Sequence, residues 1–567
     1  MPKQFSRITS SDTSQLLPTV LLMGLAILHV VITRLSWSDI PLQTDAGMWA
    51  YIGRRILDGS LLYNELWESK PPGIYYVFAA VEWLFRDNAV VALRCLDALL
   101  SLAVFGVTYR LARRFASPVA SAAATVLLSL VFCHRILSDW GDNVEKFVAL
   151  LEMTGCLLFL KGIHQSREPR EPASTRTVYL FATGICCGFA GLFKQTGILF
   201  FAVALFWIVW VGLRQTESRR TPARIGLLIL GAAFPWAVVV GFLLRAGTLT
   251  DFWSQVIQYD LFRVGGSEGE RSRLSSAEHW SNVWSHLKLI AILFMPTLLG
   301  IAWIARGLKL KADAARRNSA LNLIAMYWIV STLVFIVAPF GYGHYLLQAS
   351  PGAAIIVAHF LDGATRLKPV IQPWTVALTT SLILGVFPLV DHFVFTLDAD
   401  SRFRKTYAAQ RKQIEALTSA IVQNTRADQK VMVWPPDAAV SYYARRRTPL
   451  ESSNADVIFK GKVYRLAPPM KELIERLKAD PPEVIVDWTP TRLVPPSTET
   501  GNEPLLLVSP KGFSLYDPPY DQHPAPEGRA LAPLKHWIRE NYGGQKKDGQ
   551  VILFFRGKQW RPWPEVL

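Results

Sequence analysis

Long apolar runs separated by short polar connections dominate the first 396 positions of the chain. A run of about 20 apolar residues is long enough to cross the hydrocarbon core of a bilayer as a helix. Eleven segments come close to this length, at about 16–35, 90–109, 117–136, 145–161, 177–193, 196–213, 225–246, 287–305, 320–338, 345–361 and 372–396. The pattern therefore predicts a polytopic α-helical membrane protein with eleven spanning helices.

The orientation of these helices follows from the positions of Lys and Arg. Basic residues gather in every second connection, whereas segments 138–143 and 339–344 contain none. Because basic loops stay in the cytoplasm, we expect a cytoplasmic N-terminus and, after eleven spans, an extracytoplasmic C-terminus. The apolar stretch 73–85 is short, and a twelfth span there would break the alternation. It is predicted to be an interfacial helix.

The pattern changes near residue 397, where long apolar runs end. "KVMVW" (430–434) and "EVIVDW" (483–488) are typical of strands, and "MKELIERLKAD" (470–480) of an amphipathic helix between them. A second helix-then-strand pair is expected at 536–542 and 550–557. We therefore predict a transmembrane domain at 1–396, with outer loops 36–89 and 247–286, and an extracytoplasmic α/β domain at 397–567.

Composition and charge agree with a membrane protein. The 567 residues are 51% hydrophobic, and the formal net charge of +16 sits mostly in short loops between apolar segments. This placement has a topological explanation and does not indicate nucleic-acid binding. The five cysteines lie in apolar segments without disulfide or zinc spacing, which argues against a redox or structural-zinc role.

Ionisable side chains of interest collect at the predicted outer face. They are Asp45, Glu68 and Lys70 in the first outer loop, Asp139, Asp142 and Glu145 in the second, Lys194 in the third, Arg263 in the fourth and His344 in the fifth. A transporter tends to place such charges at mid-membrane, on broken helices. Acids and lysines gathered at one interface favour a reaction centre that acts on a lipid-linked substrate.

Four blocks carry a resemblance to a known family. They are "TDAGMWAYIGRRILDGSLLYNELWESKPPGIYYVFAAVEWLF" (44–85), "NVEKFVALL" (143–151), "GLFKQTGILFF" (191–201) and "GHYLLQASPGAAII" (343–356). Residues 16–396 resemble the GT-C superfamily of membrane glycosyltransferases, in the branch of the lipid A aminoarabinose transferases and protein O-mannosyltransferases. The resemblance implies a GT-C fold, a polyprenyl-phosphate-linked sugar donor, and transfer with inversion at the extracytoplasmic surface.

Two acids are the candidates for catalysis. Inverting transfer needs a carboxylate that takes the proton of the acceptor hydroxyl. Asp45 matches the family's first-loop acid and is our candidate base, although a helix N-cap at Thr44 or Asp45 would also explain it. Glu145 holds the place of the second outer-loop acid, for acceptor binding or metal contact. A divalent cation shared by Asp45 and Glu145 stays an open alternative, because hard cations favour carboxylates.

Two lysines are the candidates for binding the donor phosphate. Pro71 and Pro72 fix the entry into the interfacial helix and hold Lys70 at the level of lipid headgroups. A snorkelling lysine is the alternative. Lys194 is the basic residue of a short outer turn, against the positive-inside trend, which favours a phosphate contact. Glu68 either orients Lys70 through an ion pair or is a plain surface acid.

The remaining candidates lie in the last two outer loops. His344, Tyr345 and Gln348 match a family block, and His344 and Gln348 are one helical turn apart. They either bond phosphate or sugar or, for the aromatic residues, anchor a helix at the interface. Arg263 either clamps a phosphate or is a loop arginine.

These observations predict a multi-pass glycosyltransferase of the cytoplasmic membrane. It moves one sugar from a polyprenyl phosphate to a cell-envelope acceptor, which is a glycolipid such as lipopolysaccharide, a polysaccharide or a protein. An oligosaccharide polymerase or ligase is one alternative, although a pyrophosphate donor needs more cations than these two lysines. A lipid or sugar transporter is the alternative outside the enzyme class.

Overall fold

The computed structural model describes residues 11–557 of the chain with several gaps. The gaps are 39, 43, 139–140, 142, 164–172, 215–219, 262–275, 308–311, 339–341, 365–389, 391–392, 394–401, 435–436, 450–469, 488–506, 510–511, 515–533, 535–536, 539 and 549–550. Arg263 and the predicted span at 372–396 therefore lie largely or wholly outside the described residues, as do Asp139 and Asp142.

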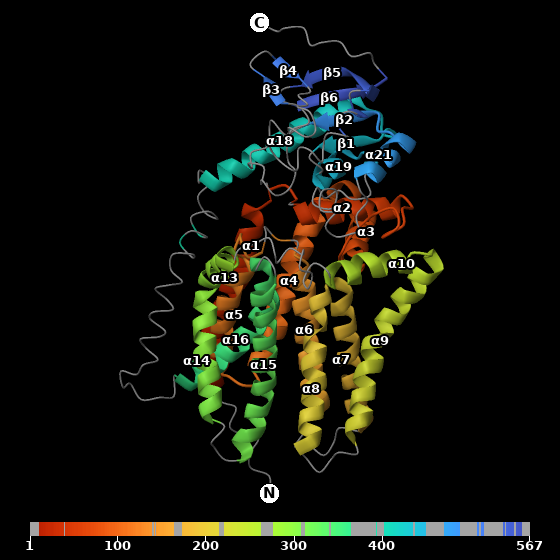
Figure 1. The fold of residues 1–567 in the computed structure, drawn as a ribbon. Coiled ribbons are helices and arrows are strands. Elements are labelled where there is room, and N and C mark those ends of the chain that lie inside the picture. The colour runs from red at the N-terminus through yellow and green to blue at the C-terminus, as the bar shows by residue number, and fades with distance from the viewer. Residues whose placement is uncertain are drawn as a thin grey trace.

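Long helices run side by side through the part of the chain predicted to cross the membrane (Figure 1). They are α1 (Ser11–Ser36), α4 (Ala89–Ala112), α5 (Pro118–Phe132), α6 (Val144–Ile163), α7 (Ala173–Phe193), α8 (Leu199–Arg214), α9 (Thr221–Ala246), α14 (Ala291–Gly307), α15 (Ala312–Val337) and α16 (Leu346–Ala364). The helix α13 (Ser276–Leu289) is bent by 84° from α14. Six helical segments among the described residues are long and apolar enough to span a bilayer, or seven with the bent pair at 279–305. The chain is a polytopic helical membrane protein, and the number eleven stays a prediction.

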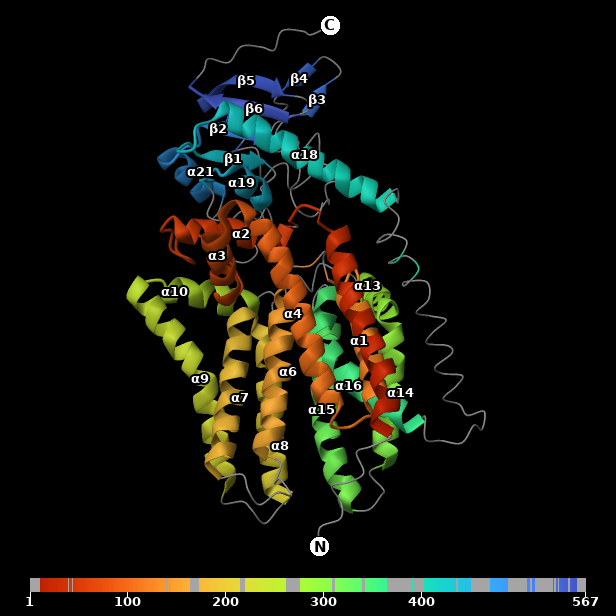
Figure 2. The ribbon, with the colours of Figure 1, turned by 180° about the vertical axis from the view of Figure 1, so that it is seen from behind.

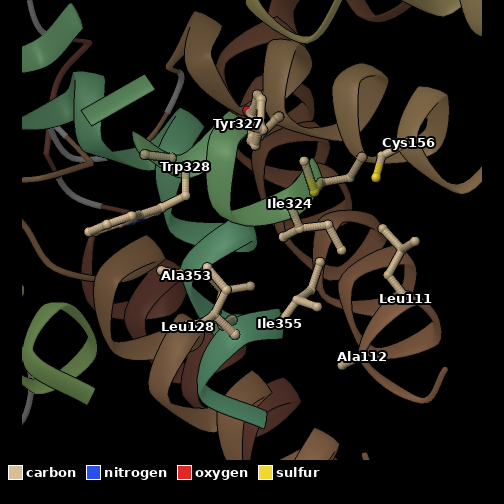
Figure 3. Packing of buried hydrophobic residues seen from close by; sticks show 14 of the residues in the cluster. Leu111, Ala112, Leu128, Cys156, Ile324, Tyr327, Trp328, Ala353 and Ile355 are labelled. Atoms are coloured by element: carbon tan, nitrogen blue, oxygen red, sulfur yellow. The ribbon is translucent and has the colours of Figure 1, made fainter. Parts of the chain in front are cut away.

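Helix α16 lies at the centre of the bundle and packs against α4, α5, α6, α14 and α15. Figure 3 shows this core, where Ala353 and Ile355 of α16 lie among side chains from those neighbours, including Leu128, Cys156 and Ile324. The helices α7 and α9 approach each other through glycine. A Cβ added at Gly184 or Gly188 would lie 2.3 or 2.4 Å from backbone oxygens of α9. Small residues let membrane helices pack at backbone distance.

Two short helices cap one end of the bundle. They are α2 (Thr44–Leu57) and α3 (Gly73–Phe85), which pack against each other and hold the first loop between them. A 3-10 turn, η1 (Arg86–Asn88), separates α3 from α4, and Arg86 takes a φ of 46° there. The helix α10 (Leu249–Phe252) and the π-helix η4 (Trp253–Gln258) lie at the same end (Figures 1 and 2).

An α/β unit follows the membrane helices in the chain and lies beyond α2 and α3 (Figure 2). Its sheet has the order β1-β2-β6-β5, with β1 and β2 parallel and the other neighbours antiparallel. Strands are found where the sequence predicted them at β1 (Val431–Trp434), β2 (Val484–Asp487) and β6 (Val551–Arg556), and a helix at α21 (Met470–Ala479). The other elements are α18 (Arg402–Asn424), α19 (Ala438–Ala444), β3 (Leu507–Ser509), β4 (Gly512–Ser514) and β5 (Tyr542–Asp548).

Helix α19 of this unit packs directly on α2. Gly47 of α2 allows the contact, because a Cβ there would lie 2.5 Å from the Cβ of Ala439. Glu82 of α3 accepts hydrogen bonds from Arg54 Nε (2.9 Å) and from Tyr442 OH (2.8 Å). Arg54 also donates to the Tyr442 carbonyl at 2.5 Å and stacks on its ring. The α/β unit is thus bonded to the helix that carries Asp45.

Candidate active site

The first loop brings Asp45 and Lys70 together. Asp45 lies in the first turn of α2, and Lys70 lies just before the Pro-Pro pair that leads into α3, with Pro72 as its N-cap. Lys70 Nζ is 3.3 Å from Asp45 Oδ2 and 5.2 Å from the centre of the Trp49 ring. The loop folds back because Tyr63, in the left-handed region at φ 71°, donates from its hydroxyl to the Lys70 carbonyl at 2.9 Å.

The Asp45 carboxyl group is both accessible from outside and ionised. Its side chain is 43% exposed, so a hydroxyl-bearing acceptor can reach the carboxylate. Desolvation alone would raise its pKa, but Lys70 and, more weakly, His344 and Lys194 outweigh it and hold the pKa below the usual value. The Asp45 and Glu68 carboxylates raise the pKa of Lys70 in return, against its own desolvation. Both groups are therefore ionised at neutral pH.

A second pair lies on the helix turns that face this loop. Lys194, between α7 and the 3-10 turn η2 (Gln195–Ile198), forms an ion pair with Glu145 in the first turn of α6. Glu145 is 1% and Lys194 8% exposed. The Lys194 ammonium also sits 3.5 Å from the centre of the Tyr345 ring, a strong cation–π geometry.

His344 completes this second group. It lies in the 3-10 turn η5 (Gly343–Tyr345), and its Nε2 is 3.7 Å from Glu145 Oε1. Desolvation lowers the pKa of His344 below its usual value even though Glu145 favours the charged form. The ring is thus neutral at pH 7. Because the Lys194 charge also acts on Asp45, the two pairs form one electrostatic cluster.

Gln348 belongs to a buried network next to this cluster. Its Nε2 donates to Glu152 Oε2 and to the Thr196 carbonyl, each at 2.9 Å. Glu152 also accepts from Tyr327 OH at 2.6 Å and from the Phe200 amide at 3.1 Å. Sequence reasoning missed Glu152 and Tyr327. An acid in the middle of a predicted span was the signal, since such residues are rare without a role.

Glu68 differs from both of its predicted roles. It is not a surface acid, because it is only 4% exposed. Its carboxylate accepts from the Ser69 amide (2.7 Å) and hydroxyl (3.3 Å), while Lys70 pairs with Asp45. Burial raises the pKa of Glu68, opposed by Lys70. Glu68 therefore stabilises the local turn of the first loop through its hydrogen bonds with the adjacent residue, Ser69.

The two site carboxylates do not fit a shared divalent cation. Each already holds a lysine ammonium in the place where a cation would bind. Within the described ranges there is also no group of three His, Cys, Asp or Glu side chains that could hold a metal ion.

A buried hub supports the second pair. Asp97 of α4, 2% exposed, forms ion pairs with Arg34 of α1 and with Lys146, the neighbour of Glu145 on α6. Arg94 donates to the Ile40 carbonyl at 3.2 Å. The hub ties three helices together immediately beside the acid of the site.

Comparisons with known proteins give a family match for part of the chain and matches to solved folds. Residues 69–239 match the family described as dolichyl-phosphate-mannose-protein mannosyltransferase. The crystal structure of ArnT from Cupriavidus metallidurans bound to undecaprenyl phosphate matches with a TM-score of 0.54 and 16% identity, over 84% of this chain and 93% of that chain. Its apo state matches with the same TM-score and coverage at 17% identity.

A second fold match is the apo oligosaccharyltransferase of Archaeoglobus fulgidus, with a TM-score of 0.50 and 12% identity, over 93% of this chain and 79% of that chain. The sequences of curated proteins gave no match. The family match and the shared fold confirm the resemblance predicted from the sequence. The chain is therefore similar to this mannosyltransferase family over residues 69–239 and shares the fold of the ArnT structures.

Proposed function

We propose that the protein transfers one sugar from a polyprenyl phosphate to a hydroxyl of a cell-envelope acceptor, with inversion, at the extracytoplasmic face of the cytoplasmic membrane. The observation that carries the proposal is the pair of lysine–carboxylate contacts, Asp45–Lys70 and Glu145–Lys194, at one end of the bundle. The solved ArnT structure with undecaprenyl phosphate supports the donor class.

In this reaction the acceptor oxygen attacks the anomeric carbon while the bond from that carbon to the phosphate oxygen breaks. Asp45 takes the acceptor proton, for which its exposed and ionised carboxylate is suited. The phosphate leaves with an added negative charge, and Lys70 and Lys194 stabilise it. Glu145 keeps Lys194 in place between turnovers, and His344 and Tyr345 line the same end of the site.

Three further assignments belong to this proposal. Arg263, in the loop that follows η4, is a third phosphate ligand. The whole outer region, loops 36–89 and 247–286 together with an extracytoplasmic domain at 397–567, faces the acceptor. That acceptor is a glycolipid such as lipopolysaccharide, a polysaccharide or a protein, and α19 places the α/β unit next to α2, where such a molecule would arrive.

Native mass spectrometry of the purified protein tests the donor, followed by a transfer assay with a polyprenyl-phosphate sugar and extracted envelope fractions. The expected result is bound polyprenyl phosphate and a labelled acceptor. A labelled glycan of several units would favour a polymerase or ligase. Sugar lipid that accumulates across proteoliposomes without any transfer would overturn the proposal in favour of a transporter.

A further inference from the structure

Gln195 lies where the two lysine-bearing segments meet. It directly follows Lys194 and opens the turn η2. Its single amide nitrogen Nε2 donates to the carbonyl of Ser69, at 2.8 Å, and to the carbonyl of Val256, at 3.2 Å. Both hydrogens of this nitrogen are therefore used, and each reaches a different segment of the chain.

The first of these bonds joins the two halves of the site. Ser69 directly precedes Lys70, and Gln195 directly follows Lys194. The hydrogen bond between Gln195 and Ser69 therefore links the two lysine-bearing segments. The second bond reaches η4, whose chain leads into the loop of Arg263. One side chain thus bonds the first loop and η4 to the turn that follows Lys194.

The turn of Lys194 is held from its other side as well. The Thr196 carbonyl accepts from Gln348 Nε2 and its hydroxyl donates to Gln348 Oε1, each at 2.9 Å. The turn is therefore fixed to α16 by Thr196 and linked to the first loop by Gln195. Loss of the Gln195 amide would leave η2 in place but would release the loop of Lys70 from it.

We propose that Gln195 is a positioning residue that sets the separation of Lys70 and Lys194 so that both ammonium groups meet one phosphate. This inference rests on the proposed function. Preorganised cations bind a ligand more tightly than the same cations on independent segments, since less ordering is needed on binding. Loss of two neutral hydrogen bonds should weaken the binding of polyprenyl phosphate about tenfold.

The test compares two glutamines, Gln195, which is half-buried, and Gln255, which is buried. Gln195→Leu removes the bridge, and Gln195→Glu keeps its length but sets carboxylate oxygens against two carbonyls. Gln255 is the matched control, because it also joins the first loop to η4, by donating to the Tyr63 carbonyl (2.5 Å) and accepting from the Glu68 amide (3.1 Å). Its bonds do not involve the turn of Lys194.

The readout is the affinity for undecaprenyl phosphate in a double-mutant cycle. Lys70→Met, Lys194→Met and the double variant are measured in the wild type, in Gln195→Leu and in Gln255→Leu. In the wild type the two lysine losses should be non-additive, because both cations hold one phosphate. In Gln195→Leu they should become additive within about twofold. In Gln255→Leu the non-additivity should persist, even where the melting temperature falls as much.

Two results separate the failure of this inference from the failure of the proposed function. Undecaprenyl phosphate that binds the wild type, with coupling unchanged in both Gln195 variants, would overturn the role of Gln195 alone. A wild type that binds no undecaprenyl phosphate and transfers no sugar would overturn the proposed function. If Gln195→Leu does not fold, the cycle is measured in Gln195→Glu.

Discussion

The pair of Glu145 and Lys194 makes an unusual demand on the donor, because its phosphate must share an ammonium that a carboxylate already holds. Glu145→Gln keeps the shape of the side chain and removes its charge. Removing one partner of a buried ion pair costs about 3–5 kcal/mol of folding stability. The lower end applies here, because the Tyr345 ring 3.5 Å from the ammonium and the new amide oxygen both compensate Lys194.

The same substitution should strengthen the binding of undecaprenyl phosphate. Two anions about 5 Å apart on one ammonium repel each other by about 3 kcal/mol at an effective dielectric constant near 20. Side-chain exposure of 10% at Lys194 admits some solvent screening and reduces this figure. We expect Glu145→Gln to bind undecaprenyl phosphate about 10- to 100-fold more tightly, which corresponds to roughly 1.4–2.8 kcal/mol.

Two assays check this expectation. Thermal unfolding without ligand should show a lower midpoint for Glu145→Gln, and titration with undecaprenyl phosphate should show the tighter binding. The turnover number should fall together with KM, since the product phosphate then leaves slowly. Asp97→Asn is the matched control. It breaks ion pairs of equal burial beside the site and should lower the midpoint while affinity stays within about threefold of the wild type.

Weaker binding of undecaprenyl phosphate by Glu145→Gln would refute the reasoning. It would mean that Glu145 orients Lys194 toward the phosphate more than it competes with it. An unchanged affinity would show that Lys194 stays paired with Glu145 throughout and does not meet the donor.

Three further changes test the other parts of the site. Asp45→Asn should lower turnover at least 1,000-fold while undecaprenyl phosphate still binds, and near-normal transfer would remove Asp45 as the base. Lys70→Met should weaken that binding about tenfold. It should also move the acid limb of the pH–rate profile to higher pH, because Lys70 no longer lowers the pKa of Asp45 and a base works only when deprotonated. An unmoved limb would contradict the pairing. Glu82→Gln, which leaves Arg54 without its charged partner, should lower the melting midpoint more than Tyr442→Phe, which removes one hydrogen bond; equal shifts would argue against a charged contact there.

The sequence predicted the membrane class and the residues of the charged cluster because both rest on local signals. Apolar length predicts helices, and the bias of Lys and Arg singles out a lysine such as Lys194 that departs from it. The acids and lysines of the first two outer loops stand in motifs that keep their order along the chain. Four of them, Asp45, Lys70, Glu145 and Lys194, lie together in one cluster in the structure.

Pairing could not be predicted in the same way, because it depends on how the loop turns back. Sequence distance suggested Glu68 as the partner of Lys70, two residues away. The Glu68 carboxylate instead accepts from the adjacent Ser69 amide, and the left-handed Tyr63 folds the loop so that Lys70 meets Asp45. A single positive φ at a residue other than glycine leaves no compositional trace.

Buried polar residues were the other class that sequence patterns left unassigned. Glu152 and Tyr327 are satisfied by partners on other helices, up to 196 positions away in the chain for Glu152 and Gln348, and the half-buried Gln195 bonds a residue of the first loop. Burying such groups without these partners would be costly, so the site forms only once the helices have packed together and brought the partners within hydrogen-bond distance. The donor phosphate would therefore meet lysines whose positions are set by amides and carboxylates that never touch it, and changes at those residues should alter donor affinity without removing any charge from the site.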